Sequence, residues 1–125
     1  MKVLIIEQEK TFQQSLQLFM ERYKSYEVFL ASSKREGISL FQTFRFDMVL
    51  CGDRLPDGSG LETVKELMKL NPKIVSIYMT VLDDDRLRHD AMKAGVRGYL
   101  VKPFDLKQLE EIIIPPTPPF VKGEI

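Results

Sequence analysis

Cysteine, histidine and tryptophan are nearly missing from this sequence of 125 residues, which has one cysteine, one histidine and no tryptophan. A lone cysteine cannot form a disulfide within the chain. Cys51 and His89 are also too few for a zinc site built from cysteine and histidine ligands. Cys51 lies within an apolar run, so we expect it to pack in the core rather than to react.

An excess of either charge is also absent, because 18 acidic residues balance 18 basic residues. Nucleic-acid-binding domains usually carry a basic surplus, so we expect no nucleic-acid partner. No apolar run reaches the length that crosses a bilayer, and the first residues do not resemble a signal peptide. We therefore expect a cytoplasmic protein with no membrane partner.

Short apolar runs do occur, and they alternate with amphipathic segments. A strand of a covered parallel sheet has a continuous apolar run, whereas a helix shows spacings of three and four. These patterns predict strands at 2–6, 26–30, 48–51, 74–79 and 96–101. They predict helices at 11–23, from 34 to about 44, 61–70, from 83 or 84 to 94, and 106–113. In the fourth helix we expect Leu87, Ala91 and Met92 to face inward.

Five strands that alternate with five helices predict an α/β domain with a parallel sheet covered on both faces. We expect the doubly wound, flavodoxin-like order 2-1-3-4-5. The predicted domain covers residues 1–113. Four of the seven prolines fall between Pro115 and Pro119, so residues 114–125 are predicted to form a proline-rich tail.

The site of such a sheet lies at the carboxyl ends of its strands, near the point where the strand order reverses. In the predicted topology this edge collects six residues from four strands. They are Glu7, Gln8, Gly52, Asp53, Thr80 and Lys102.

These residues, with several others at matching spacings, resemble the receiver domain of two-component response regulators. The matching features run from residue 1 to about 113. They are the acidic end of the first strand, the Leu55-Pro56 loop with Gly60, Thr80 after the fourth strand, Tyr99 in the fifth strand, and Lys102-Pro103-Phe104.

The resemblance implies a phosphorelay function. Receivers take a phosphoryl group from a histidine kinase onto an aspartate at the end of the third strand. Two acidic residues after the first strand help to bind Mg²⁺. The resemblance assigns Thr80 and Lys102 to contact with the phosphoryl group, Tyr99 to a rotamer change and Pro103 to a cis bond. It implies a sensor kinase or another signalling domain as partner, and a dimer surface on the fourth helix, fifth strand and fifth helix.

The sequence departs from this pattern at the acceptor position. The acceptor lies four residues before the loop proline, and counting back from Pro56 gives Gly52. Glycine has no oxygen that could hold phosphorus. Gln8 stands where the family has a second acid, which leaves Glu7 and Asp53 as weak metal candidates. We therefore predict a stand-alone receiver-like module that works without phosphorylation, catalysis or a cofactor.

Asp53 is the alternative acceptor, and using it would require Mg²⁺. It follows Gly52 by one residue, and successive strand side chains point to opposite faces. We expect Asp53 at the rim of the loop, solvated or bonded to a backbone amide, and Lys102 bonded to Glu7 or Asp53. Thr80 is either an inherited switch residue or a cap of the following loop. Tyr99 is either a rotamer switch or a core aromatic.

Overall fold

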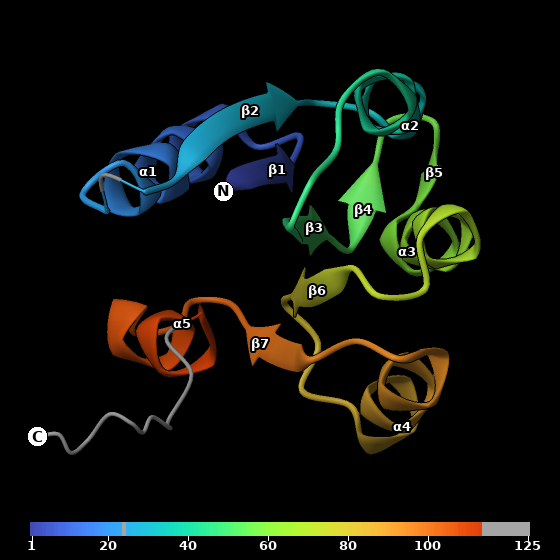
Figure 1. The fold of residues 1–125 in the computed structure, drawn as a ribbon. Helices are drawn as coiled ribbons and strands as arrows, with labels where there is room; N and C mark the ends of the chain where they lie inside the picture. Colours follow the sequence, from blue (N-terminus) through green and yellow to red (C-terminus); the bar gives the residue numbers. More distant parts are fainter. Residues whose placement is uncertain (24, 114–125) are drawn as a thin grey trace, which may run out of the picture.

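A computed structural model gives the fold, and it describes residues 1–23 and 25–113. Five parallel strands form one sheet in the order β2-β1-β3-β6-β7 (Figure 1). These are the five strands predicted from the sequence, so the predicted 2-1-3-4-5 order is confirmed. The strands are β1 (Lys2–Ile6), β2 (Glu27–Ala31), β3 (Met48–Gly52), β6 (Val75–Thr80) and β7 (Gly98–Val101).

Among the described residues, four helices connect the strands of the sheet and a fifth follows β7, and several helix ends follow ordinary capping chemistry. The side chains of Ser33, Ser59 and Asp84 accept hydrogen bonds from amides in the first turns of α2, α3 and α4. Gly95 ends α4 with a φ of 107°. The helices are α1 (Lys10–Met20), α2 (Lys34–Thr43), α3 (Gly60–Leu70), α4 (Asp85–Ala94) and α5 (Leu106–Ile113).

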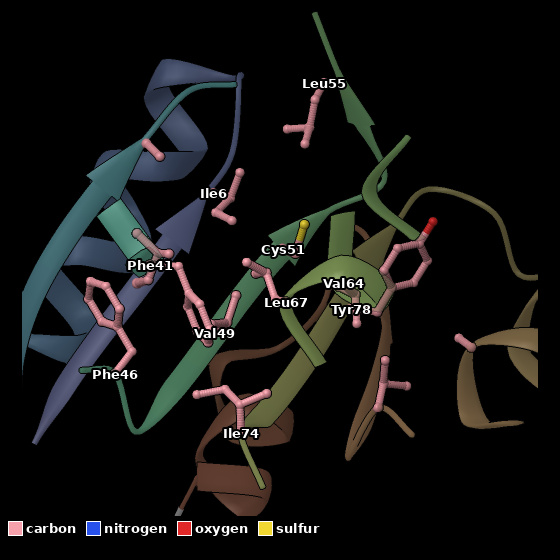
Figure 2. Close-up of a cluster of buried hydrophobic side chains, with 14 residues drawn as sticks. Ile6, Phe41, Phe46, Val49, Cys51, Leu55, Val64, Leu67, Ile74 and Tyr78 are labelled. Carbon is pink, nitrogen blue, oxygen red and sulfur yellow. The ribbon is translucent and has the colours of Figure 1, made fainter. Parts of the chain in front are cut away.

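The helices cover both faces of the sheet and create two hydrophobic clusters. Figure 1 shows α1 and α5 on one face and α2, α3 and α4 on the other. The α1/α5 cluster includes Ile5, Leu50 and Leu109. The cluster beneath α2, α3 and α4 is drawn in Figure 2 and includes Cys51 and Tyr78, which are both almost completely buried. Cys51 is thus a core residue, as expected, and burial raises the pKa of its thiol.

A short antiparallel hairpin, β4 (Arg54–Leu55) and β5 (Gly58–Ser59), follows β3 and was not predicted. The carboxylate of Asp57 at its tip accepts hydrogen bonds from the backbone amides of Lys34 and Arg35 at the start of α2. These bonds lower the pKa of Asp57. Lys34 also pairs with Glu66 of α3 at 2.7 Å, so the hairpin, α2 and α3 are linked.

One prediction about the core was wrong, and one region lies outside the described residues. Leu87 and Ala91 of α4 face the core, but Met92 is 50% exposed. A helix turns about 100° per residue, so Met92 lies well around the helix from Ala91. The predicted proline-rich tail, 114–125, is not among the described residues. Within residues 1–23 and 25–113, no helix has the length and apolar character needed to span a bilayer.

Candidate functional site

The ends of four parallel strands meet at one edge of the sheet, and strand alternation divides their side chains between the two faces. Continuing the alternation from Ile5, Leu50 and Leu100 puts Glu7, Gly52 and Lys102 on the α1/α5 face. Continuing it from Cys51 and Tyr78 puts Asp53 and Thr80 on the opposite face. The candidate site therefore has two halves.

Glu7 and Lys102 form the centre of the first half. Lys102 Nζ lies 2.9 Å from Glu7 Oε1, and the Glu7 side chain is only 2% exposed. The other carboxylate oxygen accepts a 3.0 Å hydrogen bond from the Glu9 amide. Lys102 Nζ also lies 4.5 Å from the centre of the Phe12 ring, which favours a cation there. The prediction that Lys102 bonds to Glu7 or Asp53 is confirmed for Glu7.

Gly52 ends β3 beside this ion pair. A Cβ atom built on Gly52 would lie 2.4 Å from Glu7 Oε1 and 3.2 Å from Glu7 Cδ. Real Cβ atoms do not approach oxygen this closely. The Glu7 carboxylate therefore occupies the space that a side chain at position 52 would need.

Asp53 forms the centre of the second half. Its Oδ1 accepts a hydrogen bond from the Tyr78 hydroxyl, and its Oδ2 accepts one of 2.9 Å from Thr80 Oγ1. The expectation that Asp53 is solvated or bonded to a backbone amide was wrong, because two hydroxyl groups on β6 satisfy its carboxylate. Burial first, and the bond to Asp53 second, raise the pKa of Tyr78.

A chain of hydrogen bonds connects Asp53 to the surface between α4 and β7. The Leu82 amide donates to Thr80 Oγ1 at 3.0 Å, and the Tyr99 hydroxyl donates to the Leu82 carbonyl at 2.7 Å. The guanidinium of Arg88 on α4 lies 4.8 Å from the centre of the Tyr99 ring. Thr80 is thus a buried link in this chain, and Tyr99 is its partly exposed end.

The remaining predicted residues lie around these two halves. The Gln8 side chain is exposed, and the Lys102–Pro103 bond is cis, as the resemblance implied. A hollow of about 170 Å³ lies between the halves, lined by Glu7, Gln8, Glu9, Asp53, Arg54, Thr80, Val81 and Lys102. Sequence reasoning missed Tyr78, although its place two residues before Thr80 in one strand indicates the same face.

The acidic groups of the site do not fit a resident magnesium ion. Mg²⁺ requires near-octahedral oxygen ligands and is usually held by carboxylates together with phosphate. Here Lys102 and the Glu9 amide take the oxygens of Glu7, and two hydroxyls take those of Asp53. Within the described ranges, no three His, Cys, Asp or Glu side chains are grouped so as to hold a metal ion.

Comparison with known families identifies the fold and its general role. A model of the response regulator receiver domain matches residues 3–114. The chain belongs to this family. Receiver domains act in two-component signalling, and the predicted family and fold are both confirmed.

Individual receivers agree with this assignment. The transcriptional regulatory protein ZraR of Salmonella typhimurium is 32% identical over 111 residues, which are 89% of this chain and 25% of ZraR. The CheY-like receiver of Methanospirillum hungatei has a TM-score of 0.83 at 27% identity, covering 90% of this chain and 89% of that one. A Burkholderia pseudomallei response regulator, solved with a phosphorylated aspartic acid, has a TM-score of 0.79 at 26% identity, with coverages of 87% and 64%. This receiver thus spans about a quarter of the length of ZraR.

Proposed function

We propose that this receiver is a signalling module whose output does not depend on phosphorylation. One observation carries the proposal. Gly52, the residue four before Pro56 in the receiver motif, offers no oxygen, and the space of its side chain is filled by the Glu7 carboxylate. An aspartyl phosphate needs a carboxylate oxygen in line with phosphorus. Glycine has no such oxygen, and no change in the neighbouring residues can give it one.

The two side chains that receivers use to contact a phosphoryl group give further support. Lys102 is already paired with Glu7, and the Thr80 hydroxyl already donates to Asp53. Each therefore has a carboxylate from the protein as its partner, in place of a phosphoryl oxygen. An incoming anion would have to displace a partly buried hydrogen bond on each side. We infer that the module needs no Mg²⁺ and carries out no catalysis.

Acetyl phosphate with Mg²⁺, followed by intact-mass analysis, tests the proposal. We expect no mass gain, while a receiver with an aspartate at the acceptor position gains one phosphoryl group in the same mixture. Titration with beryllofluoride and Mg²⁺ should leave the amide resonances of Gly52, Thr80 and Lys102 unchanged. A phosphoryl group on this protein that is lost in the Asp53→Asn variant would overturn the proposal.

That last outcome describes the alternative function, in which Asp53 is the acceptor. The position of Asp53 favours this alternative, because Asp53 lines the same hollow as Thr80 and Lys102. To react, Asp53 would have to release the hydroxyls of Tyr78 and Thr80 and turn toward the other half of the site. The Tyr78→Phe variant removes one of these bonds, so the alternative predicts faster labelling of this variant than of the unmodified protein.

The partners we propose are proteins: a sensor kinase, another signalling domain, or a second copy of the receiver. The surface formed by α4, β7 and α5 is the candidate dimer interface, and it exposes Met92 and Leu106 to 50% and 41%. Sedimentation analysis tests this interface. We expect association that weakens in the Met92→Glu and Leu106→Glu variants and persists in Leu18→Glu, a control on α1 that is 69% exposed. We expect no nucleic-acid binding, because the charges balance.

A further inference from the structure

We propose that Gly52 and Glu7 are a matched pair, in which the missing side chain of Gly52 allows Glu7 to hold Lys102. In this pair Glu7 is a positioning residue for Lys102. Glu7 supplies from β1 the carboxylate that the end of β3 lacks, and it keeps the Lys102 ammonium group at the centre of the site. The inference goes beyond the absence of a phosphoacceptor, because it explains what has replaced the acceptor.

The contacts of Gly52 carry the first step. The three heavy atoms nearest to a Cβ built on Gly52 all belong to the Glu7 carboxyl group, at 2.4, 3.2 and 3.6 Å. Among the described residues, Gly95 is the glycine with a positive φ, so the backbone of Gly52 is open to any residue. The obstacle to a Cβ atom at position 52 is therefore the Glu7 carboxyl group, and not the conformation of the chain.

The fixed position of Glu7 carries the second step. A carboxylate at the end of a flexible side chain could normally move aside. Here the Lys102 ammonium group and the Glu9 amide each hold one oxygen, and the side chain is 2% exposed. A methyl group at position 52 would push the carboxylate off these donors and leave Lys102 unpaired. Breaking a buried ion pair destabilises strongly, because it leaves an uncompensated charge.

A double-mutant cycle of Gly52→Ala with Glu7→Ala tests the pair. We expect Gly52→Ala to lower the folding equilibrium constant at least tenfold in the unmodified chain. In the Glu7→Ala chain it should change the constant less than threefold, because the space is then free. Gly98→Ala in β7 is the matched control: its Cβ would meet Ile112 at 2.6 Å, so its cost should be equal in both chains.

Acetylation of lysines with acetic anhydride, followed by peptide mass analysis, gives a second measurement that a merely structural effect would not change. Lys102 and Lys34 have similar exposures, 20% and 25%, and each is in an ion pair. Gly52→Ala should speed the labelling of Lys102 at least fivefold and leave Lys34 unchanged. In the Glu7→Ala chain, Lys102 should label fast whatever residue stands at position 52.

Three outcomes of these measurements would overturn the proposal. An equal cost of Gly52→Ala in the two chains, or an unchanged labelling rate of Lys102, would overturn the proposal. Should Gly52→Ala fail to fold, the Glu7→Ala/Gly52→Ala double variant must fold, and its failure would also overturn the proposal. Neither measurement uses a phosphodonor, so this inference stands or falls separately from the proposed function.

Discussion

Thr80 and Asp53 are joined through a 2.9 Å hydrogen bond from Oγ1 to Oδ2, and Thr80 is completely buried. The same Thr80 hydroxyl accepts a bond from the backbone amide of Leu82. The backbone carbonyl of Leu82 in turn accepts a bond from the Tyr99 hydroxyl. Asp53 therefore fixes the start of the segment between β6 and α4, and with it the surroundings of Tyr99.

Removing the carboxylate of Asp53 should weaken the fold and release this segment. Asp53→Ala leaves the hydroxyls of Tyr78 and Thr80 without their acceptor, at a cost of about 2 kcal/mol, since hydrogen bonds to charged groups are the stronger ones. Urea denaturation measures the loss, and the ring resonances of Tyr99 should shift. Glu27→Ala, at an exposed carboxylate, is the control and should cost less than about 0.5 kcal/mol. Unchanged Tyr99 resonances would contradict the hydrogen-bond chain.

Replacing Lys102 by methionine should destabilise the fold, because Glu7 then has no cation as its partner. The variant leaves a buried carboxylate without a cation, so we expect a loss of about 3 kcal/mol at neutral pH. Urea denaturation measures this loss, and a variant as stable as the unmodified protein would contradict the prediction.

Alkaline pH should destabilise the protein partly through Tyr78. Burial and Asp53 raise the pKa of Tyr78, so the folded state keeps its proton where the unfolded state has lost it. Stability from this group is complete below the unfolded pKa of about 10. Above that pH it falls by at most about 1.4 kcal/mol per pH unit. Tyr78→Phe should make the alkaline decline of stability shallower. A decline of unchanged steepness would show that other groups account for it.

The end of α4 offers a test that is independent of the site. Gly95 has a φ of 107°, and a Cβ there would lie 2.7 Å from Met68 Cε. Gly95→Ala should destabilise the protein by at least about 1 kcal/mol, because L-residues are strained in the left-handed region. Gly95→Asn should cost less if the backbone dominates, since asparagine tolerates this conformation. An equal cost for both variants would instead point to the contact with Met68. Thermal unfolding separates these cases.

Sequence patterns were sufficient to predict the sheet and the residues at its carboxyl edge. Continuous apolar runs marked the five parallel strands, and topology then brought Glu7, Gly52, Thr80 and Lys102 together. The partner of Asp53 could not be predicted in the same way. Choosing between solvent, a backbone amide and a hydroxyl requires knowing how far each side chain reaches across two strands, and periodicity carries no such distance.

Two other features were missed for local reasons. Arg54–Leu55 and Gly58–Ser59 are each too short to show an alternating pattern, so the β4–β5 hairpin was predicted as a loop. Met92 was assigned to the inward face of the fourth helix together with Leu87 and Ala91. The buried stripe of α4 is narrow, however, since the helix lies against the sheet mainly through Leu87 and Ala91.

The attachment of the β4–β5 hairpin to α2 restricts how the two sides of the hollow can move. Asp57 holds two amides in the first turn of α2, and Lys34 ties that turn to Glu66. Shifting the hairpin therefore requires releasing the amides at the start of α2 from the Asp57 carboxylate. The facing segment has no such tether at Val81, which is 62% exposed. Binding of a partner over the hollow should accordingly be accommodated by Val81, with the hairpin acting as a rigid wall.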